Sequence, residues 1–249
     1  MRIDFNCDLG EGCGDDAAII PLVTSASIAC GAHAGDEATM RTTLRLCREH
    51  GVAAGAHPGY PDRATFGRVD MPLPVAEIER LVAAQLTLLA DIAASEGVRL
   101  AHVKPHGALY NRAARDRSVA DAIAGAVFRI DPQLILVGLS GSQLTAAGEA
   151  AGLRIAHEVF AERRYEADGT LTPRSHPDAV IHDLDAAIAQ VRGFVRDGGV
   201  IARTGEPIAL RADTLCLHGD RADAAPFARA IREALQADGV RIAAVGAPA

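Results

Sequence analysis

Short apolar runs alternate with helical patterns along the whole chain. Apolar runs bounded by glycine or polar residues are typical of buried strands, and they occur at residues 3–9, 26–30, 51–56, 100–103, 134–139, 154–160, 214–219 and 240–245. Helices are expected between them, at residues 37–50, 75–96, 117–128, from about 142, at 183–196 and at 222–237. A repeated strand-then-helix unit predicts a parallel sheet covered by helices.

The number of these units distinguishes two parallel architectures. Seven or eight units in a chain of 249 residues fit an α/β fold in which residues 1–249 form a single β/α-barrel domain. A doubly wound open sheet is the alternative. A G-x-G-x-x-G motif after the first strand would favour that alternative, and the sequence has none there.

Composition and charge narrow the class of function. Hydrophobic residues make up 49% of the chain and aromatic residues only 4%, so aliphatic side chains must fill the core. A net charge of -7 without a basic run argues against nucleic acid and against an anionic membrane surface as partners. No charge-free segment reaches transmembrane length, and Asp4 and Asp8 interrupt the first apolar run where a secretory signal would need an apolar core. We therefore expect a cytoplasmic protein.

The five cysteines do not form a recognisable metal or redox motif. Their spacing is irregular and no C-x-x-C occurs. Reduced and mostly buried thiols are therefore expected.

Polar side chains follow most of the predicted strands. In a β/α barrel the carboxyl ends of the strands meet at one end, where active sites lie. The side chains at these positions are Asn6, Asp8, Glu11, His33, Asp36, His57, Lys104, His106, Glu158, Arg163, His218 and Asp220. Because an unpaired buried charge is costly, the convergence of so many ionisable groups predicts a functional pocket.

These residue types favour hydrolytic chemistry. The carboxylates of Asp8, Glu11 and Glu158 can act as general bases or orient a histidine. Lys104 can stabilise an oxyanion or a phosphoryl group, although an ordinary ion pair with Glu158 or Asp8 is the structural alternative. Because a buried lysine carries a desolvation cost, replacing Lys104 by Met is expected to leave stability unchanged or slightly improved.

A metal site and a nucleotide site are less clearly indicated. Four histidines could bind a divalent metal together with Asp8, namely His33, His57, His106 and His218. Their spacing does not match the H-E-x-x-H motif of many zinc enzymes. The sequence has no G-x-S-x-G elbow and no G-x-x-x-x-G-K-[ST] loop. Neither a serine hydrolase of that kind nor a self-sufficient ATPase is therefore expected.

Seven motifs, in their order along the chain, are similar to those of a known family. They are NCDLGEG, SIACGAHAGD, GAHPGYPD, FGR, HVKPHGALYN, EVFAERRY and LCLHGD. Together they resemble the LamB/YcsF family, described as the A subunit of the prokaryotic 5-oxoprolinase, from about Ile3 to Ile242. The resemblance implies a β/α barrel of the kind shared with glycoside hydrolases and carbohydrate deacetylases. It also implies ATP-dependent opening of 5-oxo-L-proline (pyroglutamate) to L-glutamate, with partner subunits B and C.

The positions and chemistry of the polar residues, which agree with the reaction that the resemblance implies, lead to expected roles. The expected catalytic residues are Asp8, Glu11, Lys104, His106 and Glu158. The expected substrate-binding residues are Asn6, His33, His57, Arg163, His218 and Asp220. ATP, with a divalent cation such as Mg²⁺, is the implied cofactor, and the missing P-loop favours a nucleotide site on the partners or at a shared interface. Two alternatives stay open: a stand-alone metal-dependent amidase or deacetylase, and a non-catalytic subunit that only binds the substrate.

The sequence departs from the family's usual pattern at a few positions. Ser27 stands where Asn is usual, Ala32 replaces an aromatic residue, Glu162 replaces Asp, and Cys7 replaces Ser or Ala. None of these changes alters the ionisable residues of the SIACGAHAGD, GAHPGYPD or HVKPHGALYN motifs.

Overall fold

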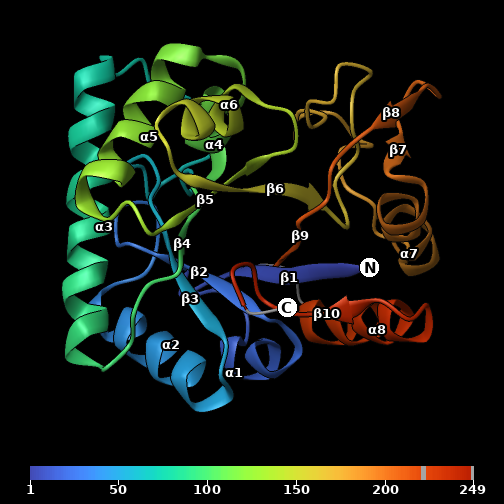
Figure 1. Ribbon diagram of the computed structural model, residues 1–249, viewed down its shortest axis with the longest axis horizontal. Helices are drawn as coiled ribbons and strands as arrows, with labels where there is room; N and C mark the ends of the chain where they lie inside the picture. Colours follow the sequence, from blue (N-terminus) through green and yellow to red (C-terminus); the bar gives the residue numbers. More distant parts are fainter. Residues whose placement is uncertain (220–222, 248–249) are drawn as a thin grey trace.

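Seven parallel strands form a closed barrel at the centre of the molecule (Figure 1). The computed structural model describes residues 1–219 and 223–247. The barrel strands are β1 (Arg2–Leu9), β2 (Ser25–Ala29), β3 (Ala53–His57), β4 (His102–Val103), β5 (Ile135–Leu139), β6 (Arg154–Phe160) and β9 (Thr214–His218). Each strand pairs with the next, and β9 pairs with β1 from Asp4↔Thr214 to Asp8↔His218, which closes the barrel. The predicted β/α barrel is confirmed, in its seven-stranded form.

The last predicted strand is shorter than expected and does not complete an eighth barrel position. Strand β10 (Arg241–Ile242) pairs only with the first residues of β1, at Arg2 and Ile3. From Asp4 onward β1 pairs with β9 and β2 instead. The remainder of the predicted run, residues 243–245, therefore lies outside the sheet.

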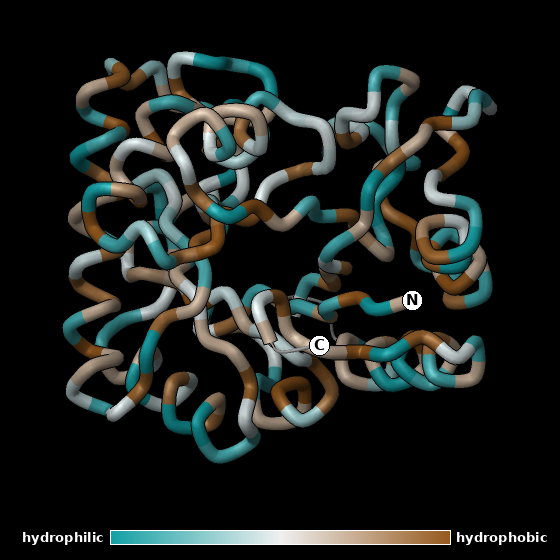
Figure 2. Tube along the Cα trace, in the orientation of Figure 1, coloured by the Kyte–Doolittle hydropathy of each residue, from teal (hydrophilic) through white to brown (hydrophobic). Residues whose placement is uncertain are grey.

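The helices lie outside the strands, as Figure 1 shows. They are α1 (Asp16–Ile19), α2 (Glu37–His50), α3 (Val75–Ser95), α4 (Gly107–Arg115), α5 (Arg117–Ile130), α6 (Gln143–Ala150), α7 (Leu184–Arg192) and α8 (Ala224–Ala237). Their apolar positions recur every three or four residues, as in α8, where Phe227, Ile231 and Leu235 are buried. Figure 2 shows hydrophobic and hydrophilic residues alternating along these helices, which is typical of helices packed on a core.

Side chains that accept hydrogen bonds from free backbone N–H groups begin several of the helices. Asp36 accepts from the N–H of Thr39 at the start of α2, and Ser142 accepts from Thr145 at the start of α6. From its place after β2, Asp36 is expected among the polar residues at the strand ends. The structure corrects this, because its exposed side chain caps a helix.

The short helix α1 and a 3-10 turn at Ile20–Leu22 were not predicted, and neither were three further elements. Helix α4 begins directly after His106, and the antiparallel strands β7 (Gly199–Ile201) and β8 (Pro207–Ala209) form a small separate sheet. Three-residue strands are too short to show an alternating pattern. The final turn of the predicted helix 183–196 is a π-helix, Gly193–Asp197.

Polar groups occupy part of the barrel interior. The Asp4 carboxylate accepts hydrogen bonds from the hydroxyls of Thr24 and Ser25, at 2.6 and 2.7 Å, and from that of Thr214. Satisfied polar groups of this kind are tolerated in a core because each hydrogen bond replaces one lost with water. No helix among the described residues is long and apolar enough to cross a membrane.

Candidate active site

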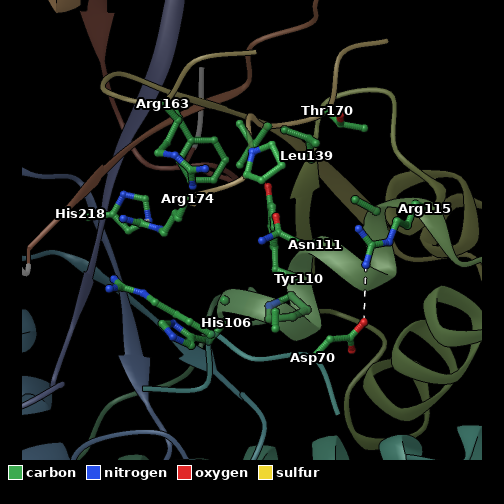
Figure 3. Close-up of a pocket in the computed structure, with 18 of the residues that line it drawn as sticks. Asp70, His106, Tyr110, Asn111, Arg115, Leu139, Arg163, Thr170, Arg174 and His218 are labelled. Atoms are coloured by element: carbon green, nitrogen blue, oxygen red, sulfur yellow. Dashed lines mark hydrogen bonds and ion pairs between the residues drawn. The ribbon is translucent and has the colours of Figure 1, made fainter. Parts of the chain in front are cut away.

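A cavity of about 650 Å³ opens at the carboxyl ends of the barrel strands (Figure 3). Its wall includes Asp8 at the end of β1, His57 at the end of β3 and Phe160 at the end of β6. The segment after β4, which contains Lys104 and His106, reaches the same cavity. Side chains from strands far apart in the sequence therefore meet at one place, as the barrel topology requires.

Lys104 occupies the floor of this cavity and is bound by two carboxylates. Its Nζ lies 2.6 Å from Asp8 Oδ1 and 2.8 Å from Glu158 Oε1, and it donates to Asn6 Oδ1 at 3.0 Å. The thiol sulphur of Cys216 lies 3.2 Å from the same nitrogen. All of these side chains are buried. Both ion pairs considered from the sequence, with Asp8 and with Glu158, are therefore present at once.

Electrostatics keep Lys104 and Asp8 ionised. Burial opposes charge on Lys104, but Asp8, Cys216 and Glu158 outweigh it, so the pKa of Lys104 lies well above its ordinary value. Burial likewise opposes charge on Asp8, but the attraction of His57 and Lys104 holds the pKa of Asp8 well below its ordinary value. The floor thus holds a lysine cation between two buried carboxylates.

Three imidazole rings meet beside the floor. His57 comes from the end of β3, His106 directly precedes α4, and His33 lies in the loop after β2. The Nε2 atom of His57 lies 2.9 Å from Nδ1 of His106, and the rings of His33 and His106 are stacked with centroids 3.8 Å apart. Burial, followed by the neighbouring His57, lowers the pKa of His33 to about 3 and holds the pKa of His106 well below its ordinary value.

The carboxylate of Glu11 faces these imidazoles. Its Oε1 lies 3.5 Å from His33 Nε2, 3.5 Å from His106 Nδ1 and 4.0 Å from His57 Nε2. One nitrogen of each ring and one oxygen of Glu11 lie within 4.8 Å of one another. We call these four residues, Glu11, His33, His57 and His106, the imidazole cluster. Asp8 joins the cluster to the floor, because its Oδ2 lies 3.3 Å from His57 Nε2.

Glycines allow the loops to approach the imidazole cluster closely. A Cβ on Gly59 would lie 2.7 Å from His33 Nδ1, and one on Gly67 would lie 2.9 Å from His33 Cβ. Gly67 also has a φ of +63°, a conformation that side chains disfavour. These contacts give a physical reason for glycine in the GAHPGYPD and FGR motifs.

The mouth of the cavity carries two guanidinium groups and an imidazole on one side. Figure 3 shows Arg163, Arg174 and His218 near one another, across the cavity from Tyr110 and Asn111 of α4. Arg163 donates to the carbonyl oxygens of Thr172 and Ala179, which fixes its guanidinium in place. Burial, followed by repulsion from Arg174, lowers the pKa of Arg163 to about 10.

His218 is held apart from the other three histidines. Its Nδ1 contacts the carboxylate of Glu162, its ring stacks on Phe160, and its Nε2 lies 3.2 Å from Arg174. The metal set considered from the sequence, four histidines with Asp8, is therefore corrected. Three histidines gather around Glu11, while His218 forms a second group with Asp8 and Cys216.

The predicted site residues thus fall into three places. The floor contains Asn6, Asp8, Lys104 and Glu158; the imidazole cluster contains Glu11, His33, His57 and His106; the mouth contains Arg163 and His218. Asp220 lies outside the described residues. Whether each of these residues acts in the predicted catalytic or binding role stays a prediction.

Some site residues do not stand out in the sequence. Cys216 touches Lys104, and Arg68 and Arg174 line the cavity. The sequence predicts reduced, mostly buried thiols, and all five cysteines are indeed free, four of them buried. Arg68 lies in the FGR motif, so the resemblance contained a signal for it. Arg174 lies in an irregular segment with no such signal.

Comparison with known proteins agrees with the resemblance. The family model described as the LamB/YcsF family matches residues 3–249. A protein of Bordetella pertussis that is named as the A subunit of 5-oxoprolinase is 56% identical over 247 residues, which are 97% of this chain and 98% of that protein. A protein of the same name from Bacillus subtilis is 51% identical over 250 residues, 98% of this chain and 97% of that protein.

A solved structure agrees as well. The crystal structure of a lactam utilization protein from Thermus thermophilus superposes with a TM-score of 0.91 at 45% sequence identity, over 98% of this chain and 100% of that one. Family match, sequence identity and fold lead to the same assignment. The chain belongs to the LamB/YcsF family.

Proposed function

We propose that this chain is the A subunit of a 5-oxoprolinase, which opens the lactam ring of 5-oxo-L-proline to give L-glutamate while ATP is cleaved to ADP and phosphate. The observation that carries the proposal is the identity of 51–56% over nearly the whole chain with proteins that bear this name. The lactam utilization protein with a TM-score of 0.91 supports a lactam as the substrate class. The proposal treats residues 1–249 as one domain and includes partner subunits B and C.

The reaction consumes one ATP and two water molecules. Transfer of the γ-phosphoryl group to the lactam oxygen releases ADP and the ring N–H proton. Water then adds to the activated carbon, the C–N bond breaks, and the nitrogen leaves as the amine. The resulting γ-glutamyl phosphate is hydrolysed by a second water to glutamate and phosphate. A stabilised amide is difficult to hydrolyse near neutral pH, so activation of its oxygen accounts for the use of ATP.

The floor supports the hydrolytic part of this sequence. Asp8 is ionised and lines the cavity, so it can accept a proton from the attacking water. Lys104 lies beside it, where its charge can stabilise a developing oxyanion, with His106 on the adjacent wall. Glu158 and Asn6 hold the lysine ammonium in place through their contacts at 2.8 and 3.0 Å.

The mouth supports an anionic substrate. Guanidinium groups of Arg68, Arg115, Arg163 and Arg174 line the cavity in a chain whose net charge is -7. Arg115 also pairs with Asp70 at 3.5 Å, an interaction drawn in Figure 3. Guanidinium groups recognise carboxylates and phosphates well. A carboxylate is carried by 5-oxoproline, and its phosphorylated form carries both groups.

ATP binding is proposed for the complex and not for this chain alone, because the sequence lacks a P-loop. A cytoplasmic location stays a prediction from the sequence.

The test is an assay of glutamate release from 5-oxoproline and ATP–Mg²⁺, by the chain alone and with subunits B and C. We expect release only with the partners, and a loss of about a hundredfold to a thousandfold in rate for Asp8→Asn, the scale of losing one preorganised electrostatic group. The chain alone should hydrolyse ATP feebly or not at all. The exposed substitution His50→Gln serves as the control.

Two other outcomes would replace the proposal. ATP-independent hydrolysis of an amide by the chain alone, abolished by a chelator, would identify a stand-alone metal-dependent amidase. Tight binding of 5-oxoproline, with turnover by the complex unaffected by Asp8→Asn, would identify a non-catalytic binding subunit.

A further inference from the structure

We propose that the imidazole cluster is a binding site for one divalent transition-metal ion of the Zn²⁺ class, with Glu11, His33, His57 and His106 as its protein ligands. Such an ion would be bound by three imidazole nitrogens and one carboxylate oxygen. This inference is independent of the identity of the lactam and of the partner subunits.

The first argument comes from the protons on His57 and His106. The Nδ1 atom of His57 lies 2.7 Å from the carbonyl oxygen of Lys104, and Nε2 of His106 lies 2.8 Å from the carbonyl oxygen of Phe66. A carbonyl oxygen only accepts hydrogen bonds, so each of these nitrogens carries the proton. In neutral rings the other nitrogens, His57 Nε2 and His106 Nδ1, then bear lone pairs, yet they face each other at 2.9 Å. A cation between them resolves this conflict.

That cation could be an additional proton on His57, because Asp8 Oδ2 lies 3.3 Å from its Nε2. His33 argues against a proton as the complete explanation. It is 1% exposed, and neither of its ring nitrogens has a hydrogen-bond partner among the described residues. Its Nε2 is directed toward Glu11 Oε1 at 3.5 Å. An unsatisfied buried polar group destabilises the folded chain, and a proton on His57 does not satisfy His33. A metal ion would give a partner to one nitrogen of each of the three rings, His33 included.

The spacing of the donor atoms suits a metal. With Zn–N bonds of about 2.0–2.1 Å, two nitrogens of a tetrahedral site are about 3.3 Å apart. The four donor atoms of the imidazole cluster lie within 4.8 Å of one another, with His57 Nε2 and His106 Nδ1 at 2.9 Å. Small rotations of the rings would bring them to the distances of a four-coordinate site.

The surroundings of the imidazole cluster resemble those of known metal sites. A histidine that binds a metal usually donates its other N–H to a carbonyl or carboxylate, which fixes the ring orientation. His57 and His106 do this with the carbonyls of Lys104 and Phe66. Phe66 has a φ of 57°, the only positive value among the described non-glycine residues. Disfavoured backbone of this kind is concentrated at functional sites.

The donor set selects the class of metal. Imidazole nitrogens suit Zn²⁺ and its neighbours in the transition series, whereas Mg²⁺ and Ca²⁺ prefer sites built from oxygen. The second group, Asp8, Cys216 and His218, is a weaker candidate, because Lys104 contacts Asp8 and Cys216 while Glu162 contacts His218. His57 and His106 also line the cavity, so an ion held by them would be accessible to a small ligand.

The test measures metal binding by the purified full chain. The chain is stripped with a chelator, titrated with Zn²⁺ by calorimetry, and analysed for bound metal by mass spectrometry after gel filtration. The titration is repeated with Co²⁺, whose visible absorption reports a four-coordinate site. We expect about one ion per chain. The variants are His33→Gln, His106→Gln and Glu11→Gln, with His50→Gln as a matched control on the exposed end of α2.

Each site variant should weaken Zn²⁺ binding at least a hundredfold while the control binds like the parent chain. Glu11→Gln preserves size and keeps the test valid if a histidine variant fails to fold, which circular dichroism would reveal. No stoichiometric Zn²⁺ binding by the parent chain, or equal binding by parent and folded site variants, would overturn the proposal. Zn²⁺ binding is measured without substrate or partner subunits, so its result does not depend on the glutamate assay. The metal site can therefore be refuted while the proposed function holds, and the proposed function can be refuted while the metal site holds.

Discussion

Replacing Lys104 by Met is the sharpest test of how the floor is stabilised. From the sequence, removal of a buried lysine is expected to leave stability unchanged or improved. The structure reverses this expectation. Lys104 Nζ contacts Asp8 at 2.6 Å and Glu158 at 2.8 Å, and these two carboxylates are 5% and 0% exposed. Removing the cation leaves these two buried carboxyl groups without the ammonium that both contact.

The expected loss follows from that arrangement. Removing one partner from a buried ion pair costs about 3–5 kcal/mol, because the remaining charge is left uncompensated. For a domain of this size, 1 kcal/mol corresponds to roughly 2–4 °C in melting temperature, so Lys104→Met should melt roughly 6–20 °C lower. The methionine fills much of the lysine's volume, so lost packing contributes little.

The assay is thermal unfolding followed by circular dichroism at neutral pH and at about pH 5. The deficit should shrink at the lower pH, because loss of the lysine raises the pKa of Asp8 and its protonation removes an uncompensated charge. The double variant Lys104→Met/Glu158→Gln serves as the matched comparison, and it should recover part of the loss because it removes one of the two carboxyl groups left without a cation. A single variant that melts within about 2 °C of the parent chain would refute this account of the floor.

Three further predictions concern residues away from the reacting centre. Burial, followed by the charge of Lys104, lowers the pKa of His102 to about 3. Below about pH 6.5 the unfolded chain therefore binds a proton that the folded chain does not bind. The free energy of unfolding should fall by about 1.4 kcal/mol per pH unit as the pH drops from there toward 3. In urea unfolding, the free energy of His102→Gln should fall less steeply with pH than that of the parent chain. Ser27→Ala removes the 3.2 Å contact between Ser27 Oγ and His102 Nε2 and should cost about 1–3 kcal/mol in the same measurement; an unchanged value would mean that this contact is not a stabilising hydrogen bond. Asp36→Ala removes the cap of α2 and should lower the melting temperature by a few degrees without changing glutamate release, whereas a loss of release at full stability would return Asp36 to the site.

The strand–helix alternation predicted the barrel because it depends on long, strongly patterned segments. The predicted helix at residues 37–50 coincides with α2, and the helix predicted at 75–96 differs from α3 by one residue. Helix α4 was missed because it follows the HVKPHG segment directly and is only nine residues long. The strands β7 and β8, with three residues each, carry no periodic signal of their own.

The sequence predicts which residues converge on the site, but not how their side chains contact one another. Barrel topology places the ends of β1, β3 and β4 at the same end, which is why Asp8, His57 and Lys104 were expected to converge. The sequence does not state how far each side chain reaches into the cavity. Glu11 and His33 lie in loops, and their contacts with His106 depend on how residues 59–67 fold over them. The separation of His218 depends on Glu162, one of the positions at which this chain departs from the usual family pattern.

Asp8 links the two halves of the site. Its Oδ1 lies 2.6 Å from the Lys104 ammonium, and its Oδ2 lies 3.3 Å from His57 Nε2 in the imidazole cluster. A proton accepted by Asp8 during turnover would weaken its attraction to both neighbours at once. Conversely, a cation bound by the imidazole cluster would stabilise the ionised form of Asp8 and so lower its strength as a base. The charge state of the imidazole cluster and the reactivity of the floor are therefore coupled through this one carboxylate, whichever cation the imidazoles hold.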